Sequence, residues 1–151
     1  MKARLEYRKI HEHAPGIAHA LRSLTAAVNE SGLEAGLLEL VKVRASQING
    51  CAFCLDMHFR DALKLGERPE RLLILDAWRE APDFSERERA ALAWTEALTK
   101  ITEGHVPDAV YAEATAAFSE KELANLTAAV IAINAWNRVM IAYRIPPAKP
   151  A

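Results

Sequence analysis

Residues 39–58 read ELVKVRASQINGCAFCLDMH and contain both cysteines of the chain, three positions apart. The Asn-Gly dipeptide at 49–50 interrupts two runs of helical periodicity, and we expect one of its residues to cap the second helix. Cys51 would then lie in the first helical turn. Cys54 and His58 would share a stripe with it, because positions i, i+3 and i+7 fall on one helix face. Unpaired backbone N–H groups and the positive end of the helix dipole favour a thiolate there, and the thiolate is the reactive form of cysteine.

Apolar residues recur at three- and four-residue intervals on both sides of this segment, which predicts helices. Pro15 and Pro69 suit first helical positions, and Gly66 suits the left-handed position that ends a helix. Residues 85–88 (SERE) and 119–122 (SEKE) have the spacing of capping boxes. No alternating strand pattern of useful length is present, so the predicted fold class is all-α, a compact bundle of six or seven helices. The expected helices span about 15–30, 33–45, 51–65, 69–79, 85–102, 107–118 and 119–145.

Length and composition limit the organisation of the chain. Its 151 residues, 51% hydrophobic and 26% charged, suit a single helical domain over 1–151, with the central motif at about 33–66. Lys and Arg number 19 against 20 Asp and Glu, which gives no reason to expect nucleic acid as a partner. The sequence contains no run of 18 apolar residues, so we expect no membrane partner. Charges near the N-terminus disfavour a signal peptide. We expect a cytoplasmic protein whose residues 146–151 form a frayed tail.

The two cysteines allow three interpretations. In a reducing compartment this spacing indicates redox chemistry or metal binding rather than a disulfide framework. Structural zinc normally takes four ligands, and only Cys51, Cys54 and His58 are supplied locally, so Glu39 or a subunit contact would have to complete a zinc site. Buried and inert thiols are the third interpretation. The stripe shared with a histidine favours redox-active thiols.

His58 and Glu39 are candidates for a proton relay. An imidazole four residues after Cys54 can exchange a proton with that thiol, and a carboxylate on the preceding helix could take part. The alternative for Glu39 is a salt bridge to Lys42 or Arg44.

Other residues that stand out are interpreted as structural. Ser46 and Asn49 should cap the turn between the two helices and so fix Cys51. The three tryptophans suit a core or a subunit interface. Asn134 and Asn137, on an otherwise apolar helix, indicate buried polar contacts, with a subunit boundary as one place for them.

The central segment resembles the alkylhydroperoxidase AhpD-like branch of the carboxymuconolactone decarboxylase superfamily. The stretch 133–138 (INAWNR) is also similar to the last helix of that family, and together these parts cover about a third of the chain. The residues that carry the match in the central segment are Glu39, Lys42, Arg44, Ser46, Asn49, Cys51, Cys54 and His58.

The resemblance implies a homotrimer or homohexamer of helical subunits that reduces hydroperoxides with its own two thiols, without flavin, haem or obligatory metal. It implies that Cys54 is attacked by peroxide and that Cys51 resolves the sulfenic acid, with His58 and Glu39 as the relay. Such a sulfenic acid condenses with a nearby thiol, which protects it from irreversible oxidation. Cys51, nearer the helix start, is expected to be the more exposed thiol and to meet the reductant first. That reductant would be a lipoylated protein, a thioredoxin-like protein or a small thiol.

The chain departs from the family at Phe53, where the best-known members have a second histidine, so the relay is shorter or different here. Two other classes of function stay open. One is a redox-sensing or structural oligomer whose disulfide switches packing without significant turnover. The other is the decarboxylase or lactone chemistry found elsewhere in the superfamily, which is disfavoured because those relatives generally lack the cysteine pair.

Overall fold

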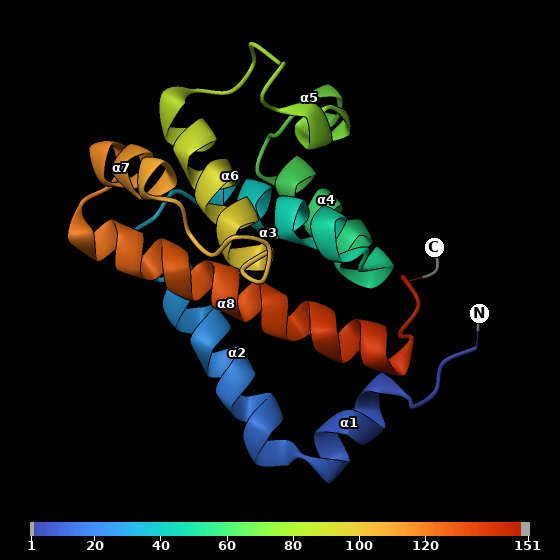
Figure 1. Cartoon of the computed structure of the whole chain (residues 1–151). Coiled ribbons are helices and arrows are strands. Elements are labelled where there is room, and N and C mark those ends of the chain that lie inside the picture. The colour runs from blue at the N-terminus through green and yellow to red at the C-terminus, as the bar shows by residue number, and fades with distance from the viewer. Residues whose placement is uncertain (1, 149–151) are drawn as a thin grey trace.

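The computed structural model describes residues 2–148, which form eight α-helices and one short 3₁₀ helix (Figure 1). No strand occurs in that part of the chain, so the all-α prediction is confirmed. The elements are α1 (Tyr7–His13), α2 (Pro15–Asn29), α3 (Ala35–Asn49), α4 (Ala52–Lys64), α5 (Pro69–Leu73), η1 (Leu75–Ala77), α6 (Glu86–Thr99), α7 (Asp108–Ala117) and α8 (Glu120–Tyr143).

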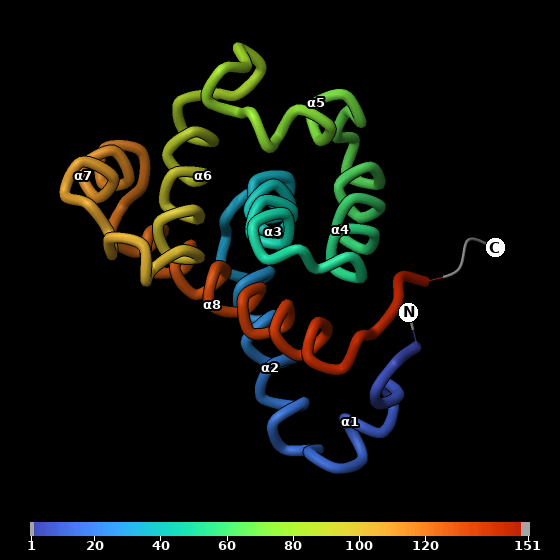
Figure 2. Tube along the Cα trace, turned by 45° about the vertical axis from the view of Figure 1, so that its right-hand side comes forward, coloured from blue at the N-terminus to red at the C-terminus, as the bar shows by residue number. Residues whose placement is uncertain are grey.

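Helix α3 is the centre of the bundle. Figure 2 shows it nearly end-on, with α4 on one side, α6 on the other and α8 passing beneath. Nine of its 15 residues are buried, including Glu39, Lys42 and Ser46. A helix surrounded in this way has no solvent-facing side on which to keep its polar residues. Each of those side chains must therefore find a partner inside the protein.

Helix α8 is the longest helix and packs against α2, α3 and α6. By length and composition alone it could cross a membrane. Leu126, Val130, Ile133 and Met140 are nevertheless buried in the bundle, as the periodicity predicts. Ile141, directly after Met140, is exposed. Helix α8 is thus explained as a core helix of this fold.

Capping boxes begin α6 and α8, as the sequence predicts. The Ser85 hydroxyl accepts the backbone N–H of Glu88, and the Glu88 carboxylate accepts the backbone N–H of Ser85. Ser119 and Glu122 make the same two hydrogen bonds at the start of α8. Each box satisfies two of the N–H groups that the first turn of a helix leaves unpaired.

The single helix expected over 69–79 is wrong beyond Leu73. The chain continues as η1, and Leu72, Leu75 and Trp78, three residues apart, are all buried. A 3₁₀ helix has three residues per turn, so Leu75 at the start of η1 and Trp78 directly after it both face the core. The indole N–H of Trp78 also donates to Glu96 at 2.8 Å.

The structure has more helices than the six or seven expected, because α1 precedes Pro15 as a helix of its own. The break falls at Ala14, as expected for a residue before proline, whose helical conformation is sterically disfavoured. Helix α3 extends four residues past its predicted end, and α6 ends three residues before its own predicted end. Of the predicted tail, residues 146–148 carry no helix, and residues 149–151 lie outside the described part.

Replacing Ser119, the N-cap of α8, tests how much a capping box stabilises the fold. Ser119→Ala removes the hydroxyl that accepts the N–H of Glu122, and we expect a loss of about 1 kcal/mol in the free energy of unfolding. Urea denaturation measures this change. Ser23→Ala, at an exposed position inside α2, is the matched control and should shift stability by at most a few tenths of a kcal/mol. Equal effects of the two substitutions would contradict the capping role.

Candidate functional site

Gly50 connects α3 to α4 and has a φ of 69°, a left-handed conformation that suits glycine. The backbone N–H of Cys51 then donates to the carbonyl oxygen of Ser46 at 3.0 Å. Cys51 itself is the N-cap of α4, so the helix begins one residue later than predicted. Its Sγ accepts the backbone N–H of Cys54 at 3.4 Å. A sulfur atom thus takes the place that a serine or aspartate oxygen usually holds.

Cys51 and Cys54 form a disulfide, with their Cα atoms 5.4 Å apart. Both side chains are only 1% exposed and pack with Ile133 and Met140 of α8. The expectation that Cys51 is the more exposed thiol is therefore wrong. Its role as the cap turns its side chain inward over the first turn of α4, where α8 covers it.

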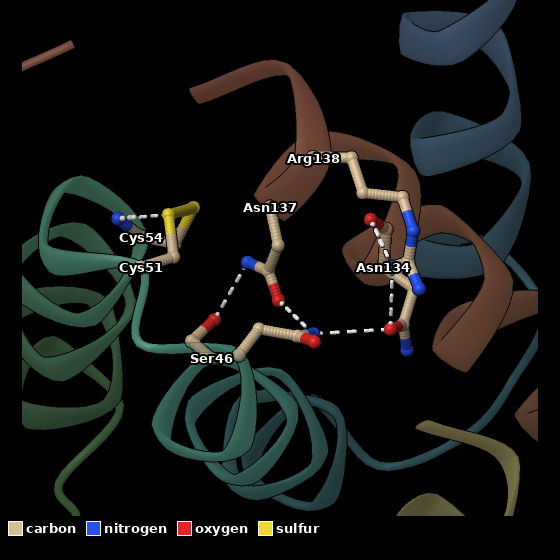
Figure 3. The surroundings of a disulfide bond; sticks show 7 residues. Ser46, Cys51, Cys54, Asn134, Asn137 and Arg138 are labelled. Atoms are coloured by element: carbon tan, nitrogen blue, oxygen red, sulfur yellow. Dashed lines mark hydrogen bonds between the residues drawn. A yellow bond between two sulfur atoms is a disulfide. The ribbon is translucent and has the colours of Figure 1, made fainter. Parts of the chain in front are cut away.

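Polar side chains tie this turn to α8 (Figure 3). The amide nitrogen of Asn49 donates to the side-chain oxygens of Asn134 at 3.0 Å and Asn137 at 2.8 Å. Figure 3 shows Asn137 reaching from α8 toward Ser46, whose hydroxyl accepts its amide N–H at 3.0 Å. The predicted buried contacts are confirmed for Asn137, whereas Asn134 is only half-buried; the contacts of both are made within one chain. Ser46 and Asn49 do fix the turn, but they do so through α8, while Gly50 caps α3.

Glu39 and His58 meet where α3 packs against α4. Nδ1 of His58 lies 2.8 Å from Oε2 of Glu39, and Nζ of Lys42 lies 2.8 Å from Oε1 of the same carboxylate. All three side chains are buried, with Glu39 and Lys42 each 8% exposed. The contact with His58 and the alternative salt bridge to Lys42 therefore exist together. Arg44 pairs with Glu96 instead.

The electrostatics of this cluster determine which ring nitrogen of a neutral His58 carries the hydrogen. Burial would raise the pKa of Glu39, but the hydrogen bond from His58 and the charges of His58 and Lys42 outweigh it and hold that pKa below its usual value of 4.5. Near neutral pH the carboxylate is ionised and can only accept hydrogen bonds. In a neutral imidazole the hydrogen is then on Nδ1, and Nε2 is the nitrogen left to accept or release a proton.

A cavity of about 470 Å³ opens beside His58, and we call it the histidine cavity. Cys54 and His58 both line it, whereas Glu39 lies behind His58. Its other lining residues come mainly from α2, α4 and α8 and include Arg22, Lys42, Phe53, Met57, Ile133, Trp136 and Met140.

A second cavity, of about 590 Å³, reaches Cys51 from the side of the C-terminal segment, and we call it the tail cavity. Arg4 and Arg144 line it together with residues 145–147. Phe53 and Met140 line both cavities and so separate them. The two cysteines, although bonded to each other, therefore line different cavities.

Glu39, His58 and Asp61 could also offer three ligand atoms to a metal ion, since these atoms lie within 4.8 Å of one another. Lys42 and Lys64 already pair with the two carboxylates at 2.8 and 2.6 Å. A cation would therefore compete with both ammonium groups for these carboxylates. The zinc site built on both cysteines is not formed in this state, because a disulfide offers no thiolate ligand.

Several lining residues were not found from the sequence. The sequence places Trp136 only in a core or an interface. It follows Ile133 by three residues and precedes Met140 by four, however, and this shared helical phase is the signal that places it on the cavity. Tyr7 and Arg22 carry no motif. Their place in the cavity depends on packing of the N-terminal helices against distant parts of the chain.

The lowered pKa of Glu39 makes stability depend on pH with a definite sign. Because the folded pKa lies below 4.5, Glu39 stabilises the fold fully above that pH and loses this contribution as pH falls through the folded pKa. Glu39→Gln should therefore show a smaller drop in the free energy of unfolding between about pH 5 and about pH 3 than the wild type. Urea denaturation at several pH values measures both slopes. Exposed Glu70→Gln is the control and should follow the wild type; a wild-type slope in Glu39→Gln would refute this account.

Known proteins are similar to this chain in sequence and in fold. Residues 15–97 match the carboxymuconolactone decarboxylase family. The uncharacterized protein YdfG of Bacillus subtilis strain 168 is 37% identical over 142 residues, which cover 94% of this chain and 95% of YdfG.

Solved structures give the same result. A protein of unknown function from Agrobacterium tumefaciens, suggested to be the antioxidant defence protein AhpD, superposes with a TM-score of 0.93 at 38% identity, covering 99% of this chain and 100% of that one. The debrominase Bmp8 superposes with a TM-score of 0.81 at 19% identity, covering 91% of this chain and 74% of its own, a likeness of fold alone. The chain thus belongs to the carboxymuconolactone decarboxylase family and has an AhpD-like fold.

Proposed function

We propose that this protein is a thiol-dependent peroxidase that reduces hydroperoxides with Cys54 and Cys51. The observation that carries the proposal is the placement of Cys54 and His58 on one cavity, with Cys51 already bonded to Cys54. Glu39 accepts the Nδ1 hydrogen of His58 and so orients the ring. Two thiols that can close a disulfide supply the two electrons that reduction of one hydroperoxide requires.

In the first half of the proposed cycle, His58 takes the proton of the Cys54 thiol at Nε2. The thiolate attacks the terminal oxygen of the hydroperoxide, so that an S–O bond forms while the O–O bond breaks. The departing alkoxide takes the proton from His58 and leaves as the alcohol. Cys54 is left as a sulfenic acid.

In the second half, the sulfur of Cys51 attacks the sulfur of the Cys54 sulfenic acid. The S–S bond forms, the S–O bond breaks, and the hydroxide leaves with the proton of Cys51 as water. An external dithiol, or two molecules of a monothiol, then reduces the disulfide to two thiols and is itself oxidised to a disulfide. We propose a lipoylated protein, a thioredoxin-like protein or a small thiol as this reductant, with the tail cavity as its route to Cys51.

Phe53 affects both the proposed proton relay and the proposed separation of the two cavities. It lies between the two cavities, at the position where the best-known AhpD-like proteins have a second histidine. The proposed relay on α4 therefore runs through His58, and the aromatic ring keeps the peroxide side apart from the reductant side.

The relatives support the proposal to different degrees. The Agrobacterium protein, similar over its whole length, is the one suggested to act in antioxidant defence. Bmp8 shows that a protein of this fold can be a debrominase, so the fold by itself does not select the reaction. A cycle that consumes thiols needs a reducing compartment, and we therefore propose a cytoplasmic protein with neither nucleic acid nor membrane as its partner.

Replacing each cysteine separately tests the assigned roles. Cys54→Ser should abolish hydroperoxide consumption, because no thiolate is left to break the O–O bond. Cys51→Ser should allow one turnover and then accumulate overoxidised Cys54, because nothing resolves the sulfenic acid. Peroxide loss by the pre-reduced proteins after removal of the reductant, and mass spectrometry of the cysteine peptide, measure both effects. Thr115→Ser, on exposed α7, is the control; wild-type turnover in both cysteine variants would refute the proposal.

The burial of both sulfurs favours one other candidate, a redox sensor or structural oligomer whose disulfide changes packing without significant turnover. Stopped-flow measurement of hydroperoxide consumption by the reduced protein separates the two. A rate constant well above that of a free thiol supports the peroxidase, and one no greater than that of a free thiol supports the sensor.

We also propose that the protein assembles as a homotrimer or homohexamer. Large apolar side chains on α2 and α8 are exposed on the isolated chain, among them Ile17 and Ile131, as is Leu73 at the end of α5. Burial of such side chains between subunits would remove apolar surface from water. Light scattering coupled to size exclusion should give a mass of three or six chains; a stable monomer at micromolar concentration would contradict this prediction.

A further inference from the structure

The histidine cavity combines apolar walls with positive charge. Its walls are formed largely by Phe53, Met57, Ile133, Trp136 and Met140. Among its lining residues, which belong to the described part of the chain, no aspartate or glutamate occurs, whereas Lys42 and Arg22 both line it. A ligand that matches this surface is apolar along its body and negatively charged at one end.

Lys42 supplies a hydrogen-bond donor at the buried end of the cavity, where its charge is paired with that of Glu39. Its ammonium group donates to Oε1 of Glu39 at 2.8 Å and to the side-chain oxygen of Asn29 at 3.2 Å. An ammonium group has three N–H donors. Within residues 2–148 those are its two hydrogen-bond acceptors, so one donor of a buried side chain is left for a group inside the cavity.

Arg22 supplies charge at the exposed edge. Its guanidinium donates to Nδ1 of His11 at 2.9 Å and, within the described residues, has no carboxylate at ion-pair distance. Arg44 and Arg87, by contrast, each pair with two acidic side chains. The guanidinium of Arg22 is therefore available to a carboxylate from outside the protein, for which its fork of N–H donors is well suited.

We infer that the histidine cavity takes an amphipathic anion, namely an organic hydroperoxide that carries a carboxylate, such as a fatty-acid hydroperoxide. The carboxylate pairs with Arg22, and the apolar body lies against Ile133 and Trp136. The peroxide group then reaches Cys54, where the spare donor of Lys42 faces the departing oxygen. The hydroperoxide part of this inference rests on the proposed function, whereas the preference for an apolar anion rests on the cavity alone.

Binding of unreactive probes tests the preference without any turnover. Oleic acid and methyl oleate, both below the concentrations at which they aggregate, are titrated while tryptophan fluorescence is followed, because Trp136 lines the cavity. Oleic acid should bind on the order of tenfold more tightly than the ester, the size expected for one charge-assisted hydrogen-bonded pair. Arg22→Gln should reduce this ratio toward one. Arg68→Gln, an exposed arginine outside the cavity, is the matched control and should keep it.

The same comparison with linoleic acid hydroperoxide and its methyl ester tests the substrate. We expect kcat/KM for the acid to exceed kcat/KM for the ester by a similar ratio. In Arg22→Gln this ratio should fall toward one. Equal binding of oleic acid and methyl oleate by the wild type would overturn the inference, and so would an acid preference that survives in Arg22→Gln. If the acid binds preferentially but neither hydroperoxide is consumed, the anion site stands and the peroxidase proposal fails.

Discussion

An ionised carboxylate on the innermost helix of a bundle must be paired, because an isolated buried charge costs several kcal/mol. Glu39 is such a group, and its two oxygens are taken by Lys42 one turn along α3 and by His58 on α4. The second contact exists only if α4 lies against α3 in one register. The electrostatic requirement of a single side chain therefore helps to set how two helices pack, and the same requirement leaves Nε2 of His58 as the nitrogen free to exchange a proton.

A second constraint acts on the other end of the same helices. Asn137 of α8 is fully buried, and its amide is satisfied by Ser46 and Asn49 at the end of α3. Loss of either partner would leave a buried polar atom unpaired. The α3–α4 turn is thus held both by its own Gly50 conformation and by α8. These contacts position the disulfide between two cavities, and this position is the basis of the proposed division between a peroxide side and a reductant side.

The parts of this arrangement that could be predicted from sequence are those set by local spacing. The stripe of Cys51, Cys54 and His58 and the two capping boxes follow from helical geometry over a few residues. The burial of Cys51 could not be predicted in this way, since it depends on α8, some 80 residues later in the chain. The availability of Arg22 is also a property of packing, because it depends on which distant carboxylates come near. At η1 the local preference for a continuous α-helix over 69–79 is overridden, because the 3₁₀ turn buries Leu75 and Trp78.

The N-cap of α4 is an atom whose chemical state changes during the proposed cycle. As part of a disulfide, the sulfur of Cys51 is a neutral and weak acceptor for the N–H of Cys54. As a thiolate it would carry a full charge at the positive end of the helix and make a charge-assisted bond. Reduction followed by loss of the Cys51 proton would then anchor the first turn of α4 more firmly, and reoxidation would loosen it. Electron transfer and the local rigidity of the helix that carries His58 would be thermodynamically linked, each biasing the other.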